Sequence, residues 1–334
     1  MNRKEIVTAF RDVLDGSKLA HKVDTAIRPG SIVIRLGLKC GGRIGLVWGL
    51  FEFKGTGIRI YGVAPGLGEA KNFPELSKLL AMVNRGMAAG CFEFEAASYQ
   101  IRFRHFADCT GFAEVPAGFV CDTLLLPFEM FARHGDSFVA LEEGFPDASL
   151  AFGMARTDGG FDVPGCNPGD TGEPGMDKDA IFAAVMRYLE AVGAECEVET
   201  TPDGYTLSCP ASGTGSPLKA VPQTFEIWGT HLAVSAHCPV QAAPGHVAET
   251  AKFLALANYN LIPGRFDLDV ATGKVCYRHC VDCAGFAELP IETLSRFCPI
   301  PCLMLRQYGD AIAAVATGRS DAESALAQAK KKGM

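Results

Sequence analysis

The sequence predicts an α+β protein built from two tandem repeats, each an antiparallel β-sheet packed with α-helices. The first observation is a block, Arg104–Pro116, that returns later in the chain as Arg278–Pro290. Identities that recur at a fixed spacing indicate a duplicated structural unit. The second is that segments of helical and of strand periodicity follow in the same order in both copies. The third is the length of 334 residues, which fits two domains of about 150 residues each.

Composition narrows the class of protein. Hydrophobic residues make up 48% and charged residues 21% of the chain, as in ordinary globular proteins. The net charge of -7 argues against a nucleic-acid partner, because phosphate binding needs a basic surface. We find neither a signal-peptide pattern at the start nor an apolar run of about 18 residues that could span a bilayer. We therefore expect a cytoplasmic protein with no membrane partner.

The 13 cysteines do not have the spacing of a small secreted scaffold stapled by disulfides. In a reducing cytosol, free cysteine behaves as a small apolar residue. We expect most of these side chains to be buried thiols.

The first predicted element is an amphipathic helix over 4–14, in which Ile6, Phe10 and Val13 recur at helical spacing. The same stripe begins again at Ile181. The offset from Ile6 to Ile181 is longer by one position than the offset between the later matched blocks. One insertion or deletion must therefore fall between this helix and those blocks.

Strands are predicted next. Apolar residues alternate over 32–38, which favours a strand. Segments 51–56 and 225–230 then share the pattern Phe-Glu-x-x-Gly-Thr. We expect the same hairpin twice, with Gly55 and Gly229 where the turn needs a positive φ.

A second helix is expected after Pro65 and after Pro239, ending near Asn84 and Asn258. A second hairpin follows it in each half. There Phe92 and Phe103 point to one side of the sheet while Glu93 and Arg102 point to the other. One face is therefore expected to be core and the other wet, with acidic-to-basic pairs across the strands.

Helices close each half. Pro116 and Pro290 suit the first turn of a helix, and a second proline, Pro127 or Pro301, is expected to start a longer one. For the last helix of the chain, Ser320 with the Glu three residues later forms a capping-box pattern.

The segment between the halves is rich in glycine and proline, the composition of a linker. We expect a first repeat over 1–158, a linker over 159–177 and a second repeat over 178–334.

One interpretation of the repeated block is that it is a catalytic site. His105, Asp108 and Cys109, with His279, Asp282 and Cys283 in the second copy, are residue types that form activated nucleophiles. In a straight strand, however, His105 and Cys109 would lie about 13 Å apart, too far for a hydrogen bond. The alternative is that His105 continues an apolar face and that Asp108 belongs to a turn.

A second interpretation is that the cysteines of the second half bind a metal ion. Zinc needs four nitrogen or sulfur ligands, but the first repeat carries other residue types at four of these positions, and the spacing matches no standard zinc knuckle. We therefore predict no metal site. The candidate ligands are Cys276, His279, Cys280, Cys283, Cys298 and Cys302.

Glu114 and Glu288 recur near a predicted helix start, where a carboxylate is stabilised by the helix dipole. We find no phosphate loop, dinucleotide fingerprint, nucleophile elbow or zinc-protease motif. We predict no catalytic and no cofactor-binding residue, and no cofactor. The candidate binding residues are Arg104, His105, Asp108, Glu114, Arg278, His279, Asp282 and Glu288.

Taken in order, these elements resemble two fused copies of the YbjN type of bacterial domain, a family assigned to sensory transduction regulation and similar in fold to the small acidic chaperones of type III secretion. The resemblance implies a chaperone-like fold and an intramolecular pseudo-dimer, because relatives of that fold pair and bind extended segments of partner proteins. The residues that carry it are Asn84 and Asn258 at the helix ends, Gly90-x-Phe92 and Gly264-x-Phe266 at the strand entries, Arg104 and Arg278 in the hairpins, and Gly135-Asp136 and Gly309-Asp310.

The sequence thus favours a non-enzymatic protein- or peptide-binding module, chaperone-like or regulatory. The alternative is an enzyme or a metal-dependent sensor that uses His105, Asp108 and Cys109 or their partners in the second half. A third hypothesis, a small-ligand module, requires a sizeable apolar cavity.

Overall fold

The computed structural model divides into two compact units, residues 1–79 with 89–174 and residues 80–88 with 175–334. Each unit holds one six-stranded antiparallel sheet packed with helices, which confirms the predicted α+β class. Of the expected linker, only Met176 and Asp177 lie among the described residues. Within the described part of the chain, no helix is long and apolar enough to cross a membrane. The described residues are 1–25, 30–65, 67, 73–95, 97–110, 112, 114–155, 176–210, 221–259, 261–284 and 286–332.

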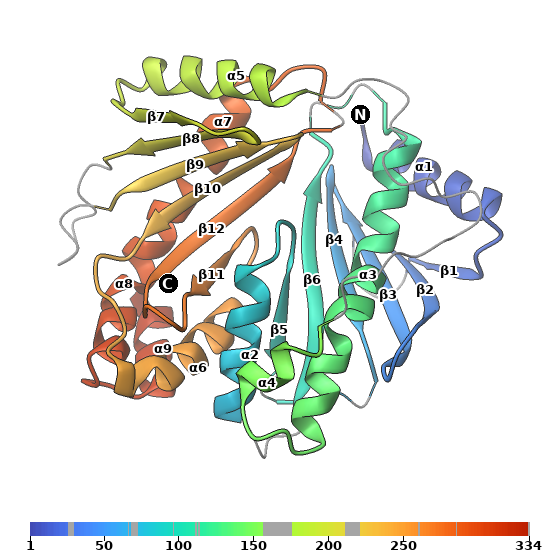
Figure 1. Cartoon of the computed structure of the whole chain (residues 1–334). Helices are drawn as coiled ribbons and strands as arrows, with labels where there is room; N and C mark the ends of the chain where they lie inside the picture. The colour runs from blue at the N-terminus through green and yellow to red at the C-terminus, as the bar shows by residue number, and fades with distance from the viewer. Residues whose placement is uncertain are drawn as a thin grey trace. The chain divides into compact units, whose positions relative to one another are not determined.

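The first unit has its helices and strands in the order α, four strands, α, two strands and two closing helices. They are α1 (Arg3–Gly16), β1 (His21–Asp24), β2 (Ile32–Cys40), β3 (Gly45–Lys54), β4 (Gly57–Val63), α2 (Phe73–Arg85), β5 (Cys91–Glu95), β6 (Gln100–Asp108), α3 (Ala117–Glu142) and α4 (Ala148–Phe152). From residue 80 on, α2 belongs to the second unit. The sheet order is β1-β2-β3-β4-β6-β5, and α3 packs against four of its strands (Figure 1).

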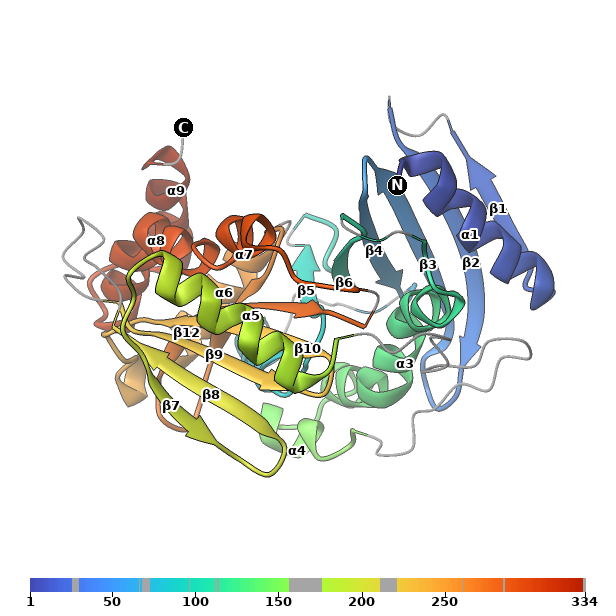
Figure 2. The same ribbon diagram turned by 90° about the horizontal axis from the view of Figure 1, so that it is seen from above.

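The second unit repeats this plan. Its elements are α5 (Lys178–Ala191), β7 (Glu197–Thr200), β8 (Gly204–Cys209), β9 (Gln223–Trp228), β10 (His231–His237), the short 3-10 helix η2 (Pro244–His246), α6 (Val247–Asn258), β11 (Arg265–Leu268), β12 (Val275–Asp282), α7 (Ile291–Phe297), α8 (Ile300–Ala316) and α9 (Ala322–Lys332). The sheet order is β11-β12-β10-β9-β8-β7, and α5 packs along β8 and β9 (Figure 2).

The first hairpin is duplicated as predicted. Phe51 of β3 pairs with Ile60 of β4, and Phe225 of β9 pairs with Val234 of β10. All four side chains are fully buried, so the same alternation builds the core side of both sheets.

The second hairpin of each unit opens on a glycine that no other residue can replace without strain. Gly90 has a φ of 68° and Gly264 a φ of 89°, in the left-handed region that favours glycine. A Cβ at either position would also lie 2.7 Å from the carbonyl oxygen of Arg104 or Arg278. The close approach of the strand backbone therefore requires glycine at both.

Phe92 is the centre of the aromatic core of the first unit. Its ring lies edge-on to Phe103, Phe131 and Phe138, with centroids 5.6, 5.0 and 4.9 Å away. Such pairs contribute about 0.5–1.5 kcal/mol each beyond the area that they bury. These contacts join β5 to β6 and to α3.

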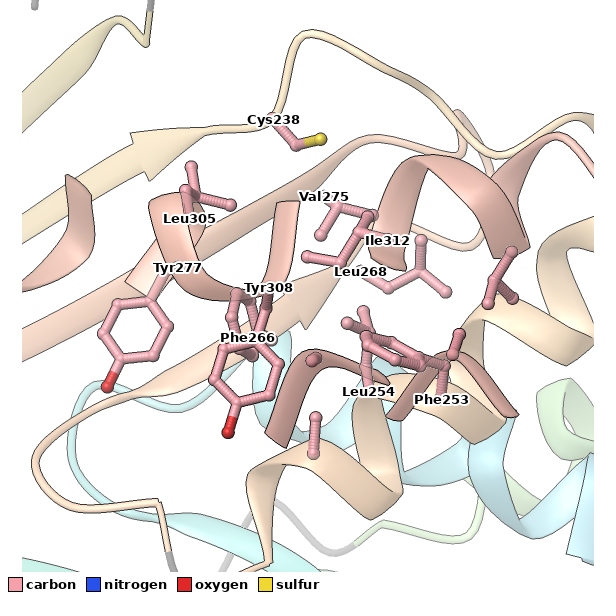
Figure 3. Close-up of a cluster of buried hydrophobic side chains, with 14 of the residues drawn as sticks. Cys238, Phe253, Leu254, Phe266, Leu268, Val275, Tyr277, Leu305, Tyr308 and Ile312 are labelled. Atoms are coloured by element: carbon pink, nitrogen blue, oxygen red, sulfur yellow. The ribbon is translucent and has the colours of Figure 1, made fainter. Parts of the chain in front are cut away.

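Phe266 has the same place in the second unit. It packs edge-on against Tyr277 at 4.9 Å and Tyr308 at 5.4 Å. Figure 3 shows these rings among Leu254 and Leu305, side chains that come from α6 and α8. One aromatic position thus joins sheet to helix in both repeats.

The prediction that Pro127 starts a helix is wrong, whereas the matching prediction for Pro301 is confirmed. Helix α3 runs unbroken from Ala117 to Glu142 with Pro127 buried inside it. In the second unit the chain breaks between α7 and α8, and Pro299 and Pro301 lie at the start of α8. The first repeat has Leu125 where the second has Pro299, so the additional proline explains the break.

The predicted capping box at Ser320 is also wrong. Asp321 caps α9, since its carboxylate accepts from the backbone N of Ser324 at 2.8 Å. Asp147, its counterpart in the first repeat, caps α4 in the same way. The Ser320 hydroxyl instead donates to the carbonyl of Asp321, and the Glu323 carboxylate pairs with Lys252 at 2.7 Å.

The predicted acidic-to-basic pairs form in the first unit but change partner in the second. Glu93 pairs with Arg102 across the strands at 2.5 Å and with Arg104 at 2.9 Å. It is fully buried, so the face expected to be wet is enclosed at this position. The resulting charge-assisted hydrogen bonds offset the desolvation of the carboxylate.

In the second unit Asp267 faces Cys276 instead of an arginine. Its partner is Arg265 on its own strand, at 2.8 Å. The equivalent of Arg265 in the first repeat is Cys91. An arginine and a cysteine have therefore exchanged places between the repeats, and the buried acid keeps a cation beside it.

A repeated glutamate links the second helix of each repeat to its last one. Glu75 accepts from the backbone N of Ala148 at 3.0 Å, and Glu249 accepts from that of Ala322 at 2.8 Å. Glu249 also lies 3.8 Å from Lys252. Each carboxylate satisfies a backbone N–H at the start of the last helix, which has no partner inside that helix.

We expect the substitution Glu249→Ala to lower the free energy of unfolding by about 1–2 kcal/mol, because the Ala322 amide loses its acceptor. Urea unfolding measures the stability, and hydrogen exchange at Ala322 should accelerate. Glu323→Ala, which removes only an exposed ion-pair partner of Lys252, should change stability by less than about 0.5 kcal/mol. Equal effects of the two variants would contradict the capping role.

Candidate functional site

In each unit the repeated block ends a strand, β6 or β12, in a turn held by an aspartate. In the first unit the Asp108 carboxylate accepts from the Thr56 hydroxyl at 3.1 Å and from the backbone N of Thr110 at 2.9 Å. In the second unit Asp282 accepts from the Thr230 hydroxyl at 2.8 Å and from the backbone N of Ala284 at 3.0 Å. Both aspartates thereby bind the end of one strand to the turn of the neighbouring hairpin.

The two cysteines after these aspartates are enclosed. Cys109 and Cys283 are fully buried, and each donates its backbone N–H to the carbonyl of the hairpin threonine. Burial, reinforced by the adjacent aspartate, raises the pKa of each thiol to about 12. A thiol must ionise to act as a nucleophile, so this environment suits packing rather than attack.

The two histidines differ in exposure. His105 is half-buried on β6, opposite Ile60 of β4. His279 is 8% exposed and lies edge-on to the ring of Phe297, 5.5 Å away. Burial lowers the pKa of His279 to about 4, although hydrogen bonding to the backbone of Phe297 opposes that shift. His279 is therefore a neutral core residue at pH 7.

Glu114 and Glu288 are both exposed, three residues before α3 and α7 begin. The N-caps of these helices are Pro116 and Pro290, and neither helix receives a side-chain cap. The prolines thus lie one position before the first turn in which they were expected, and the glutamates make no capping bond.

The cysteines considered as metal ligands are distributed over several surroundings. Cys276 and Cys280 lie on the polar face of β12, opposite His237 and Ala233, whereas Cys283 and Cys298 are buried. Over the residues that the structure describes, no group of three or more His, Cys, Asp or Glu side chains could hold a metal ion.

The polar face of the second sheet gathers aromatic and charged side chains. The ring of Trp228 stacks on His231 at 5.5 Å, and the guanidinium of Arg278 lies 5.8 Å from the Trp228 ring centroid. Arg278 also pairs with Glu226 at 2.7 Å. Of the candidate binding residues, Arg278 is thus placed beside an aromatic ring, whereas Arg104 is buried in the ion pair with Glu93.

The four strands that end the two sheets differ in accessibility. Strands β5 and β11 are buried along nearly all their length, and β1 is mostly half-buried. Strand β7, by contrast, is exposed at all four residues and pairs only with β8 in the described part of the second sheet (Figure 2). An exposed edge strand presents unpaired backbone groups to an incoming chain.

Sequence reasoning missed β7, although a signal was present. Glu195, Glu197 and Glu199 alternate with Cys196 and Val198, which is the period of a strand. The polar composition hid this signal, because strands are usually recognised by alternating apolar residues. The candidate edge therefore consists of residues that the duplicated block does not contain.

We expect His279 to make the protein less stable in acid. Its pKa falls from 6.5 to about 4 on burial, so the unfolded chain binds more protons than the folded one between these values. The stabilisation is complete above pH 6.5 and is lost as the pH falls toward 4, by as much as about 3 kcal/mol.

Chemical unfolding of the wild type and of His279→Phe across this pH range tests the assignment. The stability advantage of the wild type should shrink on acidification, because a phenylalanine ring does not titrate. His134→Phe serves as a comparison, since burial also lowers the pKa of His134 to about 4. Curves for wild type and His279→Phe that stay parallel would show that His279 does not titrate as inferred.

No family model, no curated protein and no solved structure matches this chain.

Proposed function

We propose that this protein is a non-enzymatic protein- or peptide-binding module, chaperone-like or regulatory, that takes up an extended segment of a partner protein along β7. The observation that carries the proposal is the exposure of all four β7 residues at the end of the second sheet. An extended segment would add a strand there, with its backbone hydrogen-bonded to the free edge.

The negative charge of β7 favours a basic partner segment. Glu197 and Glu199 are exposed and lie on one side of β7 because their spacing is two residues. Glu195, just before the strand, is exposed as well. Val198 on the other side is 44% exposed and offers an apolar contact. The partner segment is therefore basic at alternate positions, and its affinity depends on ionic strength because exposed charges are screened by salt.

The resemblance to YbjN-like domains and to type III secretion chaperones, with its implied pseudo-dimer, supports the same class of function. The catalytic alternative receives less support, since Cys109 and Cys283 are buried thiols with raised pKa values and Asp108 and Asp282 are engaged in turns.

Selection from a displayed peptide library against the full chain tests the proposal. We expect enriched peptides with basic residues at alternate positions, and fluorescence anisotropy of labelled copies should show binding that weakens as salt is raised. Glu197→Lys combined with Glu199→Lys should lower their affinity about tenfold or more, because each reversal places like charges across the new strand pair.

Two further variants make the result specific. Glu190→Lys changes the same charge at an exposed position on α5 and should leave the affinity nearly unchanged. Glu288→Lys tests the repeated block instead. Loss of peptide binding in Glu288→Lys, together with unchanged binding in the β7 variant, would place the binding site in the repeated block and contradict the proposal. A library that yields no reproducible binders would also contradict it.

A further inference from the structure

Two cysteines face each other at the base of the β7–β8 hairpin. The strand register pairs Glu197 with Ser208, so the next step outward places Cys196 opposite Cys209. The side chains of these two cysteines are in hydrogen-bonding contact. Directly opposed residues of an antiparallel pair have Cα atoms about 4.5–5.5 Å apart, which lies within the range that a disulfide spans.

The first unit confirms that this is a regular strand position. Phe53 and Ile227 are equivalent in the two repeats, and they pair with Ile32 and Tyr205 respectively. Leu36 and Cys209 each lie four residues after those partners. Leu36 pairs with His21. His21 and Cys196 are equivalent positions, because they are separated by the same number of residues as Ile6 and Ile181, which match in the first helix of each unit.

The duplicated fold therefore provides the same cross-strand pair in both units, with thiols in the second unit only. The duplication does not explain the two thiols, since the first unit has His21 and Leu36 at the equivalent positions.

The two thiols differ in access. Cys196 is half-buried, and Cys209 is 4% exposed. Burial is the main cause that raises the pKa of Cys209 to about 12, and the neighbouring Cys196 adds to it. A reagent in solution therefore reaches Cys196 first. The raised pKa of Cys209 limits this thiol to slow attack on the one sulfur that it already contacts, that of Cys196.

We propose that Cys196 and Cys209 are a redox-modification site that forms a reversible cross-strand disulfide. With glutathione disulfide as oxidant, the Cys196 thiolate attacks one sulfur and releases a glutathione thiolate. Cys209 gives up its proton and attacks the Cys196 sulfur of the mixed disulfide, which forms the Cys196–Cys209 bond and releases the second glutathione. The balance is two protein thiols and one glutathione disulfide converted into one protein disulfide and two glutathione thiols.

The Cys196–Cys209 disulfide would stabilise the pairing of the edge strand β7 with β8. Strand β7 is held by its pairing with β8 in the described part of the sheet, and a covalent link at the base of the hairpin opposes its separation from β8. This consequence does not depend on whether β7 binds a peptide.

The experiment treats the full chain with glutathione disulfide and maps the products by mass spectrometry. Trypsin leaves both cysteines in one peptide, residues 188–219, whose mass should fall by that of two hydrogens. A glutamate-specific protease then cuts between them at Glu197 and Glu199, and the fragments should stay joined until dithiothreitol is added. Fragments that separate without reductant would overturn the proposal, as would Cys209 joined instead to the neighbouring Cys298.

A second measurement follows the strand itself. Brief cleavage of the folded protein at Glu197 and Glu199, quenched in reductant, should be slower by about tenfold or more after oxidation, because cleavage requires local opening of β7. Cys196→Ser, a change at a half-buried position, should abolish this protection. Cys302→Ser, a change at another half-buried cysteine of the same unit, should preserve it; protection that persists in Cys196→Ser would show that the bond lies elsewhere.

Discussion

Each sheet of this protein can exist only if one of its faces is buried under helices, and a single aromatic position organises that burial. Phe92 in the first unit and Phe266 in the second join the edge hairpin to the helices that cover it. Aromatic rings remove large apolar areas from water and have preferred edge-on geometry. The glycine two residues before each ring follows from this constraint, because the strand must approach the neighbouring carbonyl closely.

The residues that the two repeats share most visibly serve this architecture. Asp108 and Asp282 hold turns, Asp147 and Asp321 cap helices, and Glu75 and Glu249 satisfy the first amide of the last helix. The buried acid, Glu93 in the first repeat and Asp267 in the second, has an arginine beside it in both repeats, although that arginine comes from different positions. The exchange of Arg102 and Cys91 for Cys276 and Arg265 keeps a guanidinium beside the buried acid, since an unpaired buried carboxylate would be strongly destabilising.

Divergence between the repeats is therefore the better guide to function. The second unit has an exposed acidic edge strand, a tryptophan beside an arginine on the polar face, and opposed thiols where the first unit has histidine and leucine. Apart from the buried Cys209, none of these side chains belongs to the core. A binding edge with a covalent fastening at its base would make the partner-binding surface responsive to the redox state of its surroundings.

The sequence alone determined the duplication, the α+β class and the repeated hairpins, because their apolar periodicity is local and survives in both copies. It also determined the glycine turns, since a positive φ leaves a residue-type signature. Only the tertiary structure decided that Pro127 stays inside a helix, that Arg265 replaces the missing cross-strand arginine, and that Cys196 meets Cys209. These outcomes depend on strand register and on burial by distant elements. Neither register nor burial leaves a periodic pattern in the sequence.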